Sequence, residues 1–173
     1  YIEEVGGMIN AWTWKEMTFY NNQMPVEHKE RAVKILSQQL RASTFPEEKI
    51  PVEMKNIVQE IRRRNDDPKS YLAYLADQFL YGGHPLGKDT LGLEESVLNL
   101  RREGFLNFKK RYYHPGNYVF IAAGNISPEE AKRFFETYFP EPVEVAANKR
   151  APIVLNSPAT KQATHHRKEL EQV

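Results

Sequence analysis

Two glutamates, Glu53 and Glu60, are the residues whose type and spacing best suit chemistry in this sequence. The apolar spacing around them predicts a helix. At about 100° per residue, a separation of seven brings both carboxylates within roughly 20° of one helix face, two turns apart. That face borders the apolar stripe of the helix, where a carboxylate is either paired or functional. The ordinary alternative is a solvent-edge ion pair between Glu60 and Arg64 at i+4.

Two other motifs give weaker evidence for a functional site. Residues 82–88 follow the GxxxxGK pattern of a phosphate loop, but Asp89 replaces the Ser or Thr that would hold magnesium, and a helix is expected where a strand should precede. We therefore expect a structural loop. His166 and Glu169 form half of an HxxE metal motif, but the segment has an extended pattern and no second histidine follows. Each lone histidine is expected to be structural, because it lacks partner ligands.

The elements that position the two glutamates can be predicted from apolar periodicity and capping signals. Strands are expected at 10–14 and 17–20 around a bend at Lys15 and Glu16, and a strand of buried type at 118–123. Helices are expected at 26–41, 94–100, 105–112 and 127–138. A helix is also expected from a capping box at Thr44 and Glu47 to about Arg64, with Pro51 kinking or restarting it, and another from the cap at Asp67 and Pro68 to Gly82. A further strand is expected at 153–155. This order predicts an α+β fold of two layers, with helices on one face of a mainly antiparallel sheet.

Composition excludes several classes of protein. The 173 residues fit one domain, residues 1–173. With 24 basic and 23 acidic residues, net charge +1, there is no electrostatic argument for nucleic acid. No apolar run is long enough for a membrane span. The absence of cysteine excludes disulfides and thiolate zinc sites, so any metal ligand must be His, Asp or Glu.

Both ends are expected to fall inside elements of a longer protein. Residues 1–5 have the pattern of a helix tail that stops at Gly6 and Gly7, and residues 169–173 alternate as a strand does. On this expectation the domain is incomplete, and a preceding helix and a C-terminal continuation belong to the same protein.

Five motifs in order resemble the inverted-motif zinc metallopeptidases, the family of pitrilysin, insulin-degrading enzyme and the mitochondrial processing peptidase. The motifs are Gly6-Gly7-x-x-Asn10-Ala11-x-Thr13-x-x-Glu16-x-Thr18-x-Tyr20, Phe45 with Glu53 and Glu60, Asp67-Pro68, Tyr81-Gly82-x-His84-Pro85-Leu86-Gly87, and Tyr113-x-Pro115-x-Asn117 before Gly124-Asn125. The resemblance covers nearly the whole chain.

The resemblance implies a role for each matching residue. Glu60 matches the third zinc ligand of the family, and Glu53 matches a glutamate that assists catalysis or orients the site. The segment Asn10, Ala11, Trp12 and Thr13 matches the edge strand on which an extended peptide substrate lies. The other two ligands are the histidines of HxxEH, whose glutamate is the general base. That motif occurs nowhere in this sequence, and in the family it lies upstream of the position of Gly6.

Two hypotheses follow from the resemblance. In the first, the chain is part of a zinc metalloendopeptidase that works with a second homologous half or subunit and cuts peptides bound along an edge strand. In the second, it is a non-catalytic scaffold or partner half of the same fold. The first is favoured because burying two carboxylates beside an apolar stripe without a partner is costly. The sequence specifies neither the peptide nor the compartment.

Overall fold

A computed structural model describes residues 1–141 and 162–166 of the chain. The described residues form two compact units, one of residues 1–46 and 102–141 and the other of residues 47–101 and 162–166. We describe each unit by itself. The expectation of a single domain, residues 1–173, stays a prediction. The strands expected at 153–155 and 169–173 lie outside the described residues.

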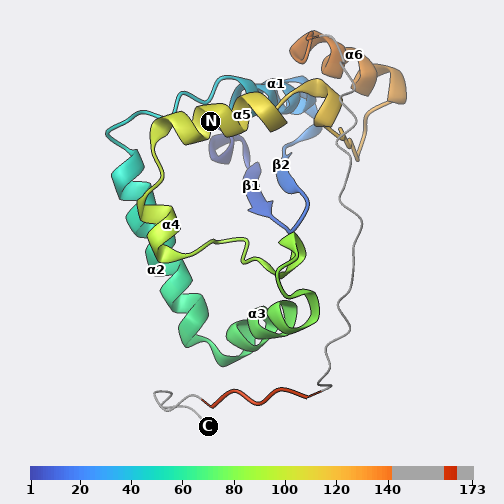
Figure 1. Cartoon of the computed structure of the whole chain (residues 1–173). Helices are drawn as coiled ribbons and strands as arrows, with labels where there is room; N and C mark the ends of the chain where they lie inside the picture. The colour runs from blue at the N-terminus through green and yellow to red at the C-terminus, as the bar shows by residue number, and fades with distance from the viewer. Residues whose placement is uncertain (142–161, 167–173) are drawn as a thin grey trace. The chain divides into compact units, whose positions relative to one another are not determined.

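The first unit contains an antiparallel hairpin of β1 (Met8–Thr13) and β2 (Thr18–Gln23), shown in Figure 1. The bend lies at Lys15 and Glu16 as predicted, and the Trp14 N–H donates to the Met17 carbonyl at 2.7 Å. A short 3-10 helix, η1 (Glu3–Val5), precedes β1 and ends at Gly6, whose φ of 73° lies in the left-handed region. The predicted glycine stop is therefore confirmed, because glycine adopts that conformation without steric cost.

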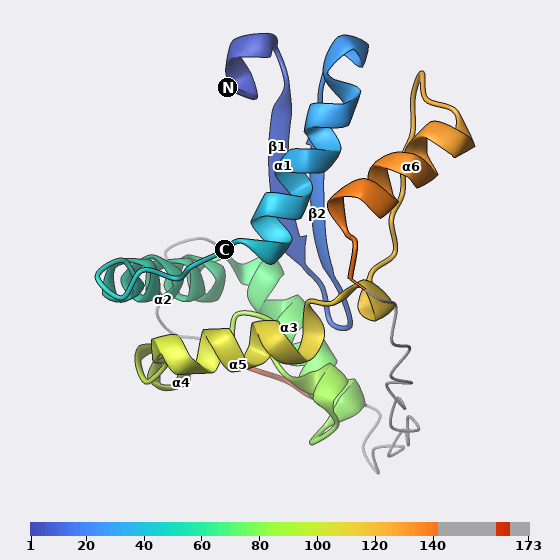
Figure 2. The same cartoon turned by 90° about the horizontal axis from the view of Figure 1, so that it is seen from above.

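Helix α1 (Lys29–Arg41), preceded by the 3-10 turn η2 (Val26–His28), packs against β2 and against α6 (Pro128–Tyr138), as Figures 1 and 2 show. The core of this unit is a cluster of Val33, Phe134 and Phe139. Helix α5 (Arg102–Tyr112) and the 3-10 turn η4 (Pro115–Asn117) complete the unit. The helices expected at 26–41, 105–112 and 127–138 are confirmed to within three residues at each end.

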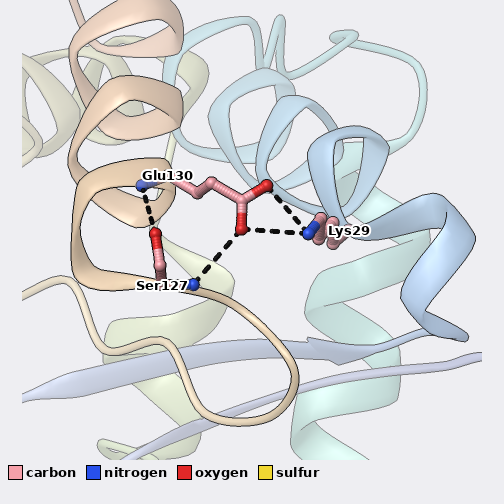
Figure 3. Close-up of polar contacts among 3 residues, drawn as sticks. All are labelled: Lys29, Ser127 and Glu130. Carbon is pink, nitrogen blue, oxygen red and sulfur yellow. Dashed lines mark hydrogen bonds and ion pairs between the residues drawn. The ribbon is translucent and has the colours of Figure 1, made fainter.

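Helix α6 begins with a capping box and is tied to α1 at the same point (Figure 3). The Glu130 N–H donates to the Ser127 hydroxyl at 3.2 Å, and the Ser127 N–H donates to a Glu130 carboxylate oxygen at 3.2 Å. That carboxylate also accepts from the Lys29 ammonium at 2.8 Å. The hydrogen bonds that this carboxylate accepts, first from Lys29 and then from the Ser127 N–H, hold the pKa of Glu130 below its usual range.

Replacing Ser127 by alanine is expected to lower the free energy of unfolding by about 1 kcal/mol, because the Glu130 N–H loses its cap. Chemical denaturation of the complete protein followed by circular dichroism measures this. The matched control is Ser96→Ala, the same change at an exposed position of α4 (Glu94–Leu98), which is expected to leave stability unchanged or slightly higher. Equal losses in the two variants would contradict the assignment of Ser127 as the cap.

The strand predicted at 118–123 is not formed in the described part of the chain. The segment alternates as a strand does: Tyr118 and Phe120 pack against the core cluster, whereas Val119 and Ile121 are 87% and 71% exposed. The prediction was wrong because an apolar run specifies an extended conformation but not a neighbour. No strand among the described residues pairs with it.

The Tyr118 hydroxyl is buried and has no hydrogen-bond partner among the described residues. Burial, and secondly the negative charge of Glu141, raise the pKa of Tyr118 to about 12 from its usual 10. As pH rises, this hydroxyl loses its proton at a lower pH in the unfolded chain than in the folded chain. Its ionisation therefore lowers the free energy of unfolding between about pH 10 and pH 12.

Tyr118→Phe is expected to raise the free energy of unfolding by about 1 kcal/mol, since an unpaired buried hydroxyl is costly. The same change removes part of the stability loss between pH 10 and 12. Denaturation curves at pH 8 and pH 11 measure both effects. Tyr112→Phe, the same change on α5, is the control, and a lower stability for Tyr118→Phe would contradict the expectation.

The second unit contains α2 (Ile50–Asp66), which packs against α3 (Pro68–Tyr81) and the short α4. The buried side of α2 carries Met54, Val58 and Ile61. The Asp67 carboxylate accepts from the Ser70 N–H at 2.8 Å, which confirms the predicted cap of α3. The helix expected at 94–100 is confirmed as α4, which ends two residues earlier.

The predicted capping box at Thr44 and Glu47 is wrong. Helix α2 begins at Ile50 without a side-chain cap, and Pro51 lies in its first turn. Of the two predicted effects of Pro51, the structure therefore has the helix start and not the kink. Upstream, the Arg102 guanidinium donates to the Thr44 and Phe45 carbonyls at 3.0 and 2.9 Å. Phe45 has a φ of 46°, a left-handed conformation incompatible with a helix start. The long-range contact therefore overrides the local signal.

The fold is α+β, as predicted, with helices and a small antiparallel sheet. Among the described residues, no helix has the length and apolar character needed to cross a membrane.

Candidate functional site

Helix α2 carries both Glu53 and Glu60 on one uninterrupted run of helical turns. Both side chains are exposed, although the neighbouring residues Met54 and Ile61 are 5% and 3% exposed. The carboxylates therefore border the buried stripe but are open to solvent, so the expectation that they are buried, which favoured the catalytic hypothesis, is wrong. Within residues 1–141 and 162–166, no ion pair or side-chain hydrogen bond reaches either of them.

The ordinary alternative, an ion pair of Glu60 with Arg64, is not formed. The Arg64 guanidinium lies 2.6 Å from the Asp89 carboxylate, and the two side chains are only 16% and 8% exposed. The Arg64 Nε–H also donates to the side-chain oxygen of the neighbouring Asn65 at 3.0 Å. The guanidinium carbon also lies 4.5 Å from the centre of the Tyr74 ring on α3.

A second ion pair joins α2 to α4. The Arg62 guanidinium donates to Glu94, the first residue of α4, at 2.8 and 3.3 Å. This hydrogen bonding holds the pKa of Glu94 below its usual range. The segment 89–94 thus supplies an acid to each of two arginines of α2. No local pattern predicts these two pairs, because 25 and 32 residues separate the partners in the sequence.

The donor chemistry of Glu60 fits a zinc ligand, since an exposed carboxylate without a cation partner can offer its oxygens to a metal. A catalytic zinc site takes three protein ligands and keeps one position open. The described residues contain no group of three metal-binding side chains. This part of the chain therefore fits as the source of one ligand rather than as a complete site.

Strand β1 carries the residues expected to bind peptide, Asn10 to Thr13, and all six of its residues are exposed. Trp14 and Met17 form the hydrogen-bonded pair that closes the hairpin. Because hydrogen-bonded and non-hydrogen-bonded pairs alternate along an antiparallel ladder, Ala11 and Thr13 belong to non-hydrogen-bonded pairs, and their backbone N–H and C=O groups point away from β2. Among the described strands, only β2 pairs with β1. The outer edge of β1 is therefore a row of backbone groups open to pairing, although the Ala11 N–H donates to the Asn10 side chain at 2.8 Å.

Two aromatic contacts hold this hairpin. The Trp12 and Phe19 rings, which are partners in the register, stack with centroids 4.4 Å apart. The Tyr20 and Tyr113 hydroxyls lie 2.8 Å apart and tie β2 to the end of α5. Burial, and secondly this hydrogen bond, raise the pKa of Tyr20 above its usual value. The stacking of Trp12 on Phe19 therefore joins β1 to β2, and the Tyr20–Tyr113 contact joins β2 to the rest of the first unit.

The phosphate-loop pattern forms a structural turn, as predicted. Helix α3 precedes it, and the pattern itself contains the 3-10 turn η3 (Pro85–Gly87), where the Leu86 N–H donates to His84 at 3.2 Å. A Cβ at Gly87 would lie 2.6 Å from the Gly82 carbonyl oxygen. Glycine is required there by close backbone approach.

The structure brings Glu53 and Glu60 together on α2 in the second unit and Asn10 to Thr13 together on β1 in the first unit. Each set lies on the type of element that the sequence predicts for it, a helix and a strand. The roles inferred for these residues, in metal binding and in peptide binding, remain predictions.

Solved structures that are similar to this chain include a protease and a putative peptidase. The periplasmic protease PqqL from Escherichia coli matches with a TM-score of 0.73 and 25% identity over 84% of this chain and 17% of that one. A putative M16-like peptidase from Alicyclobacillus acidocaldarius matches with a TM-score of 0.71 and 24% identity over 82% of this chain and 33% of that one. The fold is thus that of the M16-like peptidases.

The chain belongs to peptidase family M16, the insulinase family: residues 1–93 match the model described as Insulinase (Peptidase family M16). Residues 99–173 match the model described as Peptidase M16 inactive domain. Relatives include an uncharacterized zinc protease of Rickettsia felis, 32% identical over 78% of this chain and 34% of that protein. Another is the uncharacterized zinc protease YmxG of Bacillus subtilis, which is 31% identical over 79% of this chain and 34% of that protein. The chain spans about a third of the length of these relatives. The resemblance inferred from the motifs is confirmed.

Proposed function

We propose that this chain is part of a zinc-dependent metalloendopeptidase in which Glu60 is a zinc ligand and Glu53 assists from the preceding turns of α2. One observation carries the proposal: the Glu60 carboxylate is exposed and has no cation partner in the described residues, although Arg64 lies at i+4. An exposed carboxylate that makes no ion pair, even with an arginine at i+4, has its oxygens available to a metal ion.

Zinc, when bound, would polarise the scissile carbonyl and favour attack by water at neutral pH. The residues of α2 contribute an oxygen ligand through Glu60 and a second carboxylate, Glu53, two turns away on the same face. The two histidine ligands and the general base of HxxEH belong, on this proposal, to the part of the protein that precedes the chain. The relatives named zinc proteases support the choice of metal.

The substrate on this proposal is an extended peptide that pairs with the outer edge of β1. Main-chain hydrogen bonds to Ala11 and Thr13 would hold it, and the exposed Trp12, at 48%, would contact its side chains. Such pairing displaces the Asn10 side chain from the Ala11 N–H. A second homologous half, on the same chain or on a partner subunit, would close the other side of the peptide.

The test uses the complete protein. Zinc content is measured by elemental analysis, and hydrolysis is followed with an internally quenched peptide before and after removal of zinc with a chelator. The expected result is one zinc per active site and hydrolysis that stops on chelation and returns with added zinc. Hydrolysis that a chelator leaves unchanged would exclude the metallopeptidase.

The second candidate is a non-catalytic scaffold of the same fold. The observation in its favour is that the HxxEH motif occurs nowhere in this sequence. This hypothesis expects a complete protein that retains peptide binding by fluorescence anisotropy but shows neither zinc nor hydrolysis. Chelator-sensitive hydrolysis would rule it out.

A further inference from the structure

Three consecutive arginines, Arg62 to Arg64, follow Glu60 on α2. Side chains four residues apart on a helix are neighbours, and a glutamate placed before an arginine at i+4 is the favourable order for an ion pair. Arg64 is therefore the natural competitor of any metal ion for the Glu60 carboxylate.

The structure places Arg64 elsewhere. Its guanidinium lies 2.6 Å from Asp89 and over the Tyr74 ring, and its side chain is only 16% exposed. The Asp89 carboxylate is in turn fixed, because its other oxygen accepts from the Leu91 N–H at 3.1 Å. Asp89 is 8% exposed, so the pair sits in surroundings where charge attraction is stronger than in water.

We propose that Asp89 is a positioning residue that holds Arg64 away from Glu60 and so keeps the Glu60 carboxylate available to a divalent cation. This inference rests on the proposed function, in which Glu60 is a zinc ligand. Asp89 acts through Arg64 and does not touch the metal.

Two physical effects give Asp89 this role. A released Arg64 guanidinium would pair with Glu60 and compete with the metal for its oxygens. An uncompensated positive charge one helical turn away would also repel a dication. Both effects weaken as ionic strength rises, because salt screens exposed charges.

The experiment measures zinc affinity of the complete protein by competition with a chromophoric chelator, at low and at high salt. Asp89→Asn is expected to weaken zinc binding about threefold to tenfold, with a smaller effect at high salt. Arg64→Gln is expected to leave the affinity unchanged or higher, because it removes the competitor. The double variant Asp89→Asn with Arg64→Gln is expected to return to within about twofold of the starting protein.

The opposite directions of the two single variants distinguish this role from a merely structural one. If the ion pair only held the fold together, Asp89→Asn and Arg64→Gln would weaken zinc binding alike, and this result would overturn the proposal. Circular dichroism checks that each variant is folded. If Arg64→Gln does not fold, the double variant, which leaves no unpaired charge, still decides the matter by restoring the affinity or failing to.

Two further variants separate this inference from the proposed function. Lys55→Gln, at an exposed position of the same helix that is neither three nor four residues from Glu60, is the matched control and is expected to leave zinc affinity unchanged. Glu60→Gln must abolish tight zinc binding in the same assay. If Glu60→Gln does so and Asp89→Asn has no effect, the role of Asp89 is wrong and the zinc site stands. If Glu60→Gln retains zinc, the proposed function itself fails.

Discussion

Glu60→Gln is expected to lower zinc affinity by more than about a hundredfold and to abolish peptide hydrolysis in the complete protein. The amide has nearly the shape of the carboxylate but lacks its charge, so it is a poor zinc ligand. Loss of a residue that only orients a ligand costs about tenfold to a hundredfold, and loss of a ligand itself should exceed this. Because Glu60 is exposed and makes no described ion pair, the free energy of unfolding of the metal-free protein should be unchanged.

The matched control is Glu95→Gln, the same chemical change at an exposed position of α4. It is expected to leave zinc content and hydrolysis as they are. Elemental analysis and the quenched-peptide assay measure both variants side by side. Unchanged zinc content and rate in Glu60→Gln would show that the ligand assignment is wrong.

Phe134→Ala is expected to have the largest effect on stability, a loss of about 3–5 kcal/mol. The ring is 4% exposed and lies in the core cluster with Val33 and Phe139, where α6 packs against α1. Truncation removes its apolar surface from the core and leaves a cavity that close-packed neighbours fill only in part.

Phe108→Ala is the control, because that ring is 56% exposed on α5. Its loss should be below about 1 kcal/mol, since surface substitutions have small effects. Urea denaturation of the two variants of the complete protein provides the comparison. Similar losses would mean that the cluster around Phe134 is not the core of the first unit.

Local signals determined most helices and the hairpin. The bend at Lys15 and Glu16, the Asp67 cap and the Ser127 capping box involve residues close in sequence, and all three are formed. The same is true of Glu53 and Glu60, because the helical repeat alone places residues seven apart on one face.

Only the tertiary structure decided what those elements contact. The capping box expected at Thr44 is not formed because Arg102, 58 residues away, binds the Thr44 carbonyl. Residues 118–123 are extended as their pattern predicts, but none of the described strands pairs with them. The partner of Arg64 was also beyond the sequence: helical spacing favoured Glu60, whereas the structure supplies Asp89. Periodicity and capping are local properties of the chain, but the choice between competing partners depends on which distant residues folding brings within reach. In the described part of the chain, that choice gives Arg64 to Asp89 and leaves Glu60 without an ion pair.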